Sequence, residues 1–311
     1  MKINHDKLKE FLLFIKDKTN ITAMEIIEKD FYLNVLLSTL NLEEYVFKGG
    51  TCLAKAYLDY FRLSEDLDFT FVEQDIFNGL STKSIKKICK EKIDLFGEQL
   101  ETLGLDFVFD KKDTRYVMLG SNNKLVTFKV HYTSVVTNAP SFVKIQINFL
   151  EKIKFSPLSK KLYPLVKENN LSKEDGIFYQ EFLQFYKEKT ALVYDVKEIV
   201  AEKLRSLLTR RAIKARDAVD LLFIYQKFKI HPKDLMSESE EKTLFAINAY
   251  EKYKEHFLTA KDKLSTAVFS YNEVKHLVIT PLKKEEFDSF IEMLRPLLNV
   301  LMEKIEHGKN S

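Results

Sequence analysis

Two glycines and two aspartates form the pattern in this sequence that could do chemistry. Gly49 and Gly50 follow the short apolar stretch Val46-Phe47 and precede apolar residues at helical spacing, which predicts a strand–turn–helix unit. A glycine pair at such a turn lets the backbone approach a phosphate, with the free N–H groups of the helix start facing it. Asp66 and Asp68 alternate with apolar residues, so on a strand both carboxylates point to one face.

Two carboxylates on one face repel each other unless a cation lies between them. Mg²⁺ prefers oxygen ligands and is usually held by one or two carboxylates plus substrate phosphates. Asp66 and Asp68 are therefore predicted to be metal ligands for in-line phosphoryl chemistry on a nucleoside triphosphate. Either motif alone is commonly a plain turn or a solvated loop, but their order along the chain is much rarer by chance.

The ordered motifs resemble the nucleotidyltransferase superfamily, and in particular the AbiEii/AbiGii toxin family of bacterial nucleotidyltransferases. The resemblance spans roughly residues 20 to 225 and is carried by these segments: Ile27 to Tyr32, Gly49 to Tyr57, Phe61 to Phe69, Ile199 to Leu204, Arg210-Arg211, Arg216-Asp217 and Asp220-Leu221. It implies an enzyme that is the toxin of a toxin–antitoxin or abortive-infection system, with a cognate antitoxin. It also implies transfer of a nucleotide from an NTP to RNA, with tRNA 3′ ends as the leading acceptor.

The turn and the strand also suggest roles for individual residues. Gly49, Gly50 and Thr51 would bind the triphosphate. The Ser64 hydroxyl is a candidate phosphate contact if the strand begins that early, and a cap for the preceding helical turn is the alternative.

Lys203 and Asp217 match positions that look catalytic in the toxin family. A compact cation at residue 203 would also bind phosphate and neutralise the leaving pyrophosphate. The alternative is a helix-surface lattice of ion pairs, because Glu198 and Glu202 are spaced i, i+4, share a helix face and flank Lys203.

A third carboxylate on a neighbouring strand is common in two-metal transfer, and here it is missing. The candidate strand runs from Val143 to Phe149, and Gln146 or Asn148 stands where an acid is expected. An amide offers an oxygen ligand but cannot serve as a general base. Glu151 is a possible substitute, with a plain surface position as the alternative. The third ligand and the base therefore stay open.

Basic residues cluster after residue 202. Six fall within fourteen positions: Lys203, Arg205, Arg210, Arg211, Lys214 and Arg216. Such a run can bind a triphosphate or an RNA backbone, whereas a solvated basic helix face is the alternative.

Two other functions share the same motifs. A small-molecule nucleotidyltransferase of the aminoglycoside-modifying kind would need an acidic acceptor pocket, which the basic run disfavours. A nucleotide-binding module without turnover is the second alternative, because Gln146 replaces an acid. The sequence identifies neither the NTP nor the acceptor, the antitoxin or the oligomeric state.

Composition indicates an ordered globular protein. The chain has 311 residues, 45% of them hydrophobic, and a net charge of +3, which is too small to indicate a nucleic-acid binder by itself. No apolar run approaches the ~20 residues of a membrane span, and the first residues lack a signal-peptide pattern. Cys52 and Cys89 form no metal or disulfide pattern. A cytoplasmic location without membrane contact is expected.

Periodicity predicts an α+β protein with two domains. Helices are predicted at 7–17, 22–40 and 83–103, and strands at 107–109, 116–119, 124–136 and 142–150. Helical periodicity dominates from 196 onward. We therefore expect a sheet with flanking helices in residues 1–195 and a helical domain in residues 196–311, with Asp195 capping its first helix. The family resemblance implies that the sheet is a mixed sheet of the nucleotidyltransferase type.

Overall fold

Contacts divide the chain into two compact units. The computed structural model describes residues 3–19, 21–167, 170–260, 264 and 269–308. The first unit comprises Met1–Phe149 and Ser159–Val193, and the second comprises Leu150–Leu158 and Tyr194–Ser311. The boundary predicted after residue 195 lies two residues beyond the last crossing between the units.

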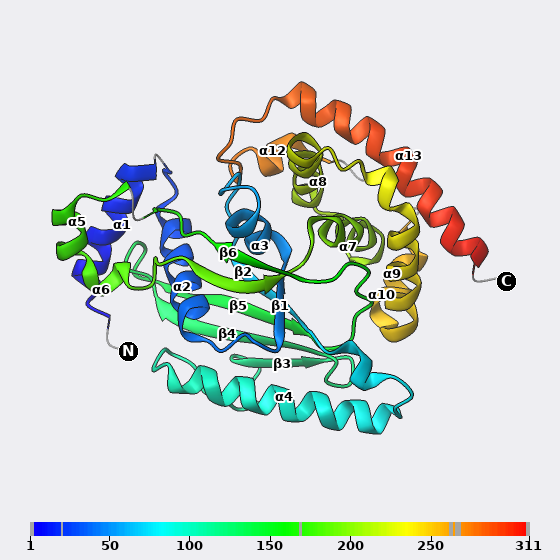
Figure 1. Ribbon diagram of the computed structural model, residues 1–311, viewed down its shortest axis with the longest axis horizontal. Helices are drawn as coiled ribbons and strands as arrows, with labels where there is room; N and C mark the ends of the chain where they lie inside the picture. The colour runs from blue at the N-terminus through cyan, green and yellow to red at the C-terminus, as the bar shows by residue number, and fades with distance from the viewer. Residues whose placement is uncertain (1–2, 20, 168–169, 261–263, 265–268, 309–311) are drawn as a thin grey trace. The chain divides into compact units, whose positions relative to one another are not determined.

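The first unit contains a sheet and the helices around it (Figure 1). Its helices are α1 (His5–Thr19), α2 (Met24–Thr39), α3 (Gly49–Ala56), α4 (Thr82–Thr102), α5 (Lys173–Phe178) and α6 (Gln180–Leu183), with the 3₁₀ turn η1 (Gln74–Phe77). Its strands are β1 (Tyr45–Lys48), β2 (Asp66–Phe71), β3 (Val117–Gly120), β4 (Leu125–Thr133), β5 (Pro140–Asn148), β6 (Leu158–Leu162, whose first residue belongs to the second unit) and β7 (Lys189–Val193).

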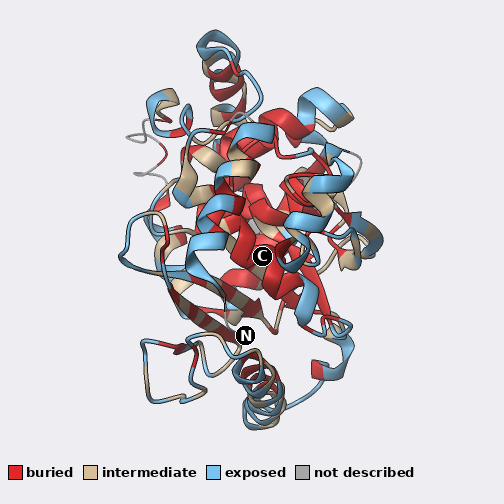
Figure 2. Ribbon diagram, turned by 90° about the vertical axis from the view of Figure 1, so that its left-hand side faces the viewer, coloured by how far each residue is buried: buried red, intermediate tan, exposed pale blue. Residues whose placement is uncertain are grey.

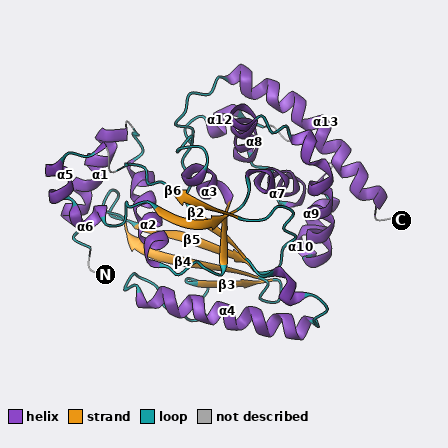
Figure 3. Ribbon diagram, in the orientation of Figure 1, coloured by secondary structure: helices purple, strands orange, loops and turns teal. Residues whose placement is uncertain are grey.

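The described strands form one seven-stranded mixed sheet in the order β3-β4-β5-β2-β1-β7-β6. Strand β2 lies inside the sheet and pairs antiparallel with β1 and parallel with β5, so the sheet is mixed. Figure 3 shows these strands beside the helices of the unit. The mixed sheet with flanking helices confirms the predicted α+β class.

The two faces of the sheet differ sharply in chemistry. One face is apolar and covered by helices: Phe96 of α4 packs against Tyr45 and Phe128, and Tyr32 of α2 stacks on Tyr132 with ring centroids 3.9 Å apart. The strands accordingly contain many buried positions, drawn red in Figure 2. Because side chains alternate along a strand, the opposite face collects the polar residues of β2 and β5.

Most predicted elements of this unit are confirmed, but the strand predicted at 107–109 is wrong. That segment has no ladder, and only the bridge between Asp106 and His131 lies beside it. Its aromatic side chains pack instead. The Phe109 ring lies 2.1 Å from where a Cβ on Gly97 of α4 would be, so the helix accepts the ring only because residue 97 is glycine.

Two further differences concern strand limits. β4 ends at Thr133, short of the predicted limit at residue 136, because the chain turns there and Ser134 binds the backbone of the turn. β6 and β7 were not predicted: β6 carries the mostly exposed residues LSKKL, and β7 pairs with β1 through a single register position, Phe47 with Val193.

The second unit is helical. It contains α7 (Val196–Thr209), α8 (Ala215–Phe228), the 3₁₀ turn η3 (Pro232–Leu235), α9 (Met236–Ala249), α10 (Glu251–Leu258), α12 (Tyr271–Val274) and α13 (Lys284–Gly308). As predicted, the Asp195 side chain caps α7 by accepting from the Lys197 N–H. Within the described part of the chain, no helix is both long and apolar enough to cross a membrane.

The segment Leu150–Leu158 is separated along the chain from the rest of its unit by residues 159–193 of the first unit. It is nevertheless bound to the helical unit by hydrogen bonds. Tyr250 donates to the Leu150 carbonyl at 2.6 Å, and Lys242 donates to the Lys152 carbonyl at 2.6 Å. A Glu198 carboxylate oxygen accepts the N–H groups of Lys154 and Phe155 at 2.8 and 2.9 Å. The segment is thus a structural part of the helical unit.

Candidate active site

The glycine turn and the aspartates of β2 are in direct contact. Gly49 begins α3 with φ of +79°, and a Cβ placed on it would lie 2.4 Å from Oδ2 of Asp68. A side chain at residue 49 would therefore collide with the carboxylate, in addition to the strain of a positive φ. The predicted pairing of a glycine turn with the Asp-x-Asp motif is seen in the structure of this unit.

Gly50 makes room for a second set of polar groups. A Cβ on Gly50 would lie 2.3 Å from Nη2 of Arg62 and 3.0 Å from Oγ of Ser64. The Arg62 side chain is buried and also donates from Nη1 to the Leu63 carbonyl at 2.8 Å. Ser64 precedes β2, which begins at Asp66, so its place beside the helix start comes from the loop and not from the strand face.

Thr51 ties the helix to the strand. Its hydroxyl donates to the Asp66 carbonyl at 2.5 Å, and its side chain is buried. The contact fixes the first turn of α3 against the residue that begins β2. In this structure the hydroxyl of Thr51 therefore holds the protein backbone, and its predicted contact with a nucleotide stays a prediction.

Strand β5 places a lysine and an amide next to the two acids. In the parallel register Asp66 is opposite Lys144 and Asp68 is opposite Gln146. The Lys144 ammonium lies 2.8 Å from Oδ2 of Asp66. Sequence reasoning missed Lys144 as a site residue, because only the register between two distant strands brings it to the acids.

The two acids suit a divalent cation. Asp66 and Asp68 share the polar face of β2 and both are partly exposed, and the Gln146 amide adds a neutral oxygen donor beside them. Hard oxygen donors of this kind fit Mg²⁺, which completes its shell with water and substrate phosphates. Among the described residues no group of three His, Cys, Asp or Glu side chains is placed to hold a metal.

Helix α2 binds different segments of the first unit through consecutive residues. Glu28 accepts from the Ser134 hydroxyl at 2.5 Å and from the Val135 N–H at 2.7 Å. Lys29 pairs at 2.5 Å with Glu65, the residue before the first acid of β2. Because a helix advances about 100° per residue, neighbouring side chains reach different segments.

Asp30, the next residue, binds helix α3. It pairs at 2.8 Å with the buried Lys55 ammonium, which also donates to Asn34 at 2.8 Å and contacts the Tyr60 hydroxyl. Burial lowers the pKa of Lys55, although the Asp30 carboxylate opposes the shift. Three consecutive residues of α2 thus bind three segments of the unit: the turn after β4, the residue before β2, and helix α3.

The predicted residues of the helical unit form a buried cluster within that unit. The Lys203 ammonium of α7 lies 2.7 Å from Asp217 and 2.6 Å from Asp220, both on α8. Arg210 also pairs with Asp217. Burial alone would raise the pKa of Asp217, but the charges of Lys203 and Arg210 hold it well below its ordinary value. The structure brings Lys203 and Asp217 together, and their catalytic roles stay predictions.

The ion-pair lattice considered for Lys203 is built by other residues. Glu198 and Glu202 pair with Lys242 of α9, and Glu202 also binds Arg205. Glu151, the considered third metal ligand, is buried and lies 3.4 Å from the same Lys242 ammonium, so the surface alternative is wrong for it.

The basic run splits into two groups. Lys203, Arg205 and Arg210 bind carboxylates of their own unit. Arg211 and Lys214 are exposed. Arg216, the sixth residue of the run, is half-buried. The two exposed side chains are therefore the part of the run that is best placed to meet a large polyanion.

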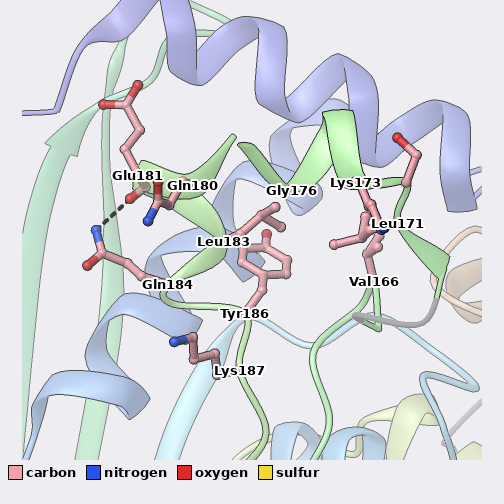
Figure 4. A pocket seen from close by; sticks show the side chains of 11 residues that line it. Val166, Leu171, Lys173, Gly176, Gln180, Glu181, Leu183, Gln184, Tyr186 and Lys187 are labelled. Atoms are coloured by element: carbon pink, nitrogen blue, oxygen red, sulfur yellow. Dashed lines mark hydrogen bonds between the residues drawn. The ribbon is translucent and has the colours of Figure 1, made fainter. Parts of the chain in front are cut away.

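A cavity of about 770 Å³ lies around α5 and α6 of the first unit (Figure 4). Leu183 and Tyr186 line it together with the charged Lys173 and Glu181. Gln184 donates to the Glu181 carbonyl at 2.7 Å along its rim. Its described lining includes none of the predicted site residues, and we assign it no chemistry.

The mixed sheet and the contact between the glycine turn and the Asp-x-Asp motif are the features expected of a nucleotidyltransferase. The family model for the nucleotidyl transferase AbiEii toxin of type IV toxin–antitoxin systems matches residues 35–306. The chain belongs to this family, which confirms the resemblance of its motifs and makes it a nucleotidyltransferase enzyme of a toxin–antitoxin family.

Two solved structures are similar in a broader sense. JHP933 of Helicobacter pylori shares 16% identity, with a TM-score of 0.43 over 92% of this chain and 95% of its own. A candidate nucleotidyltransferase of H. pylori shares 16% identity, with a TM-score of 0.41 over 91% and 97% of the two chains. No curated protein matches the sequence.

Proposed function

We propose that this enzyme transfers an NMP from an NTP to RNA in a Mg²⁺-dependent reaction and acts as a toxin, with the tRNA 3′ end as the leading acceptor. The observation that supports the transfer most directly is the Asp68 carboxylate against the Cα of Gly49. It brings an acid of the metal pair to the start of α3, where free backbone N–H groups favour phosphate.

The residues of the site divide the work of the reaction. Gly49 and Gly50 let the triphosphate approach the backbone of α3, and Asp66 and Asp68 hold the cation. When bound, Mg²⁺ would polarise the α-phosphate and balance its growing charge. An acceptor oxygen bonds to the α-phosphorus while the bond to pyrophosphate breaks, pyrophosphate leaves with the electron pair, and the acceptor proton passes to solvent.

The acceptor is assigned from family membership and charge. Arg211 and Lys214 are exposed cations close in the chain, which suits an RNA backbone better than a polycationic small molecule. A cognate antitoxin is proposed as the cellular partner, because the family is that of a type IV toxin–antitoxin system.

Labelled NTPs, Mg²⁺ and total RNA test the proposal directly. The wild-type chain should label RNA, with one NTP preferred, whereas Asp66→Ala and Asp68→Ala should lose about 100-fold or more of the transfer while keeping the fold. Transfer at wild-type rate by both variants would remove the assignment of the acids. NTP binding without transfer by the wild type would support a module without turnover.

A growth assay tests the toxin role. Expression of the wild-type chain alone should slow bacterial growth, and the Asp66→Ala chain should not. Equal inhibition by both chains would show that the harm does not come from transfer.

Steady-state kinetics test the helical cluster. If Lys203 stabilises the departing pyrophosphate, Lys203→Ala should lower kcat and kcat/KM together, by about 10²–10³. Arg211→Ala should instead weaken RNA binding and reduce its salt dependence. A Lys203→Ala variant that matches wild type in every parameter would make the cluster purely structural.

A further inference from the structure

Lys144 is the cation that this structure already places on the metal site. Its ammonium lies 2.8 Å from Oδ2 of Asp66, and the two residues are register partners on adjacent parallel strands. Their side chains are 32% and 26% exposed, so the pair borders solvent and is open to substrate and ions.

The neighbouring strand positions offer no extra negative charge. Gln146, opposite Asp68, brings a neutral amide where a two-metal site uses an acid. Asp66, Asp68 and Lys144 together carry one net negative charge, and on the other side of β2 the register partner of Asp68 is Lys48, again a basic residue. The protein would offer two dications only that charge besides the substrate phosphates, and one of the ions would approach the ammonium on Asp66, which repels it.

We propose that Lys144 takes the place of a second metal ion, so that this site binds a single divalent cation. This inference rests on the proposed function of Asp66 and Asp68. The ammonium neutralises one acid permanently, and it supplies at a fixed position the positive charge that a second ion would bring to the substrate phosphates.

Mn²⁺ titration followed by electron paramagnetic resonance measures this directly, in the presence of an NTP analogue whose α–β bond cannot be cleaved. The wild-type chain should bind one Mn²⁺. Lys144→Met should bind Mn²⁺ roughly fivefold more tightly or better, because the competing charge is gone, and yet transfer more slowly. Lys144→Arg should restore the wild-type affinity. A purely structural lysine would not tighten metal binding when removed.

Lys129→Met is the matched control. Lys129 is the register partner of Lys144 on β4, and its ammonium is 3.4 Å from the Thr114 carbonyl. Removal of this charge should leave Mn²⁺ affinity within about twofold of wild type. A comparable gain in both Met variants would make the effect one of general charge and would overturn the proposal.

Gln146→Glu in the Lys144→Met background restores three acids and should bind two Mn²⁺. Two Mn²⁺ on the wild-type chain, or unchanged affinity in Lys144→Met, would overturn the inference and leave the proposed function standing. Mn²⁺ binding that survives Asp66→Asn with Asp68→Asn would instead overturn the metal site itself.

Discussion

Two features of the structure require glycine at residue 49. Its φ of +79° and the Asp68 carboxylate at its Cα both exclude a side chain. Gly79 has a similar φ of +71°, but no atom lies within 4 Å of a Cβ placed there. A substitution at Gly79 therefore tests backbone strain alone, whereas a substitution at Gly49 tests backbone strain together with displacement of the Asp68 carboxylate.

Gly49→Ala and Gly79→Ala should each cost about 1–2 kcal/mol in unfolding free energy, because both force alanine into the left-handed region. Only Gly49→Ala should also reduce transfer, by at least about tenfold, since Asp68 must move away from its position. Thermal unfolding and RNA labelling measure the two effects. Equal activity of the two variants would contradict the contact as a requirement.

Asp217 should make the protein sensitive to acid. Its pKa is held below the ordinary value in the folded state, so its stabilising effect is fully present above the unfolded pKa of about 3.9 and is lost as pH falls below it. Asp217→Asn should cost about 3 kcal/mol at pH 7, because it leaves Lys203 and Arg210 with less negative charge.

Urea unfolding at pH 7 and pH 3 measures this. The destabilisation by Asp217→Asn should shrink at the lower pH, where the wild type has lost part of the same stabilisation. Asp288→Asn is the control, since Asp288 pairs with Lys284 on an exposed face and should change stability by less than about 1 kcal/mol. A destabilisation independent of pH would contradict the charge argument.

At the scale of elements, helix α2 is bound to α3 by the buried ion pair between Asp30 and Lys55. Lys55→Met leaves Asp30 buried without its cation and should cost about 3–5 kcal/mol, whereas Lys87→Met, from the exposed Lys87–Glu91 pair, should cost less than about 1 kcal/mol. Urea unfolding of both variants measures the difference. A double-mutant cycle with Asp30→Asn should give a coupling energy above about 1 kcal/mol; additive effects would show that the pair does not act as a unit.

The elements also show how far the sequence could go. The long periodic helices and the alternation of β2 could be predicted from the local spacing of residues. The Gly-Gly and Asp-x-Asp motifs could be recognised in the same way. The aromatic segment 107–109 misled the strand prediction, because its rings pack on Gly97 and the sheet in place of a hydrogen-bonded ladder. β6 and β7 lack alternation and depend on partners far away in the chain.

The site was only half predictable for the same reason. The shared strand face of Asp66 and Asp68 can be predicted from three consecutive residues of the sequence. Lys144 reaches Asp66 only through the register of two strands about 80 positions apart, and a single-residue shift would turn it to the other face. The buried role of Asp30 under α3 likewise depends on a contact with Lys55 across the fold.

At the scale of the whole molecule, the chain passes between its two units three times. A chain ending at Val193 would keep Leu150–Leu158 but lose its partners Glu198, Lys242 and Tyr250. Limited proteolysis should therefore cut the shortened chain within 150–158, while the full chain resists there. Equal resistance of both chains would show that the segment holds its structure without the helical unit.

The placement of residues 150–158 has a consequence for inheritance. A single recombination crossover near codon 194 would join the helices of one parent to the 150–158 segment of the other. Such a hybrid must fit a foreign segment against its own Glu198 and Lys242. An exchange of the whole helical unit therefore needs a second exchange that carries these nine codons along. We expect recombination to replace the two units together more often than the helical unit alone.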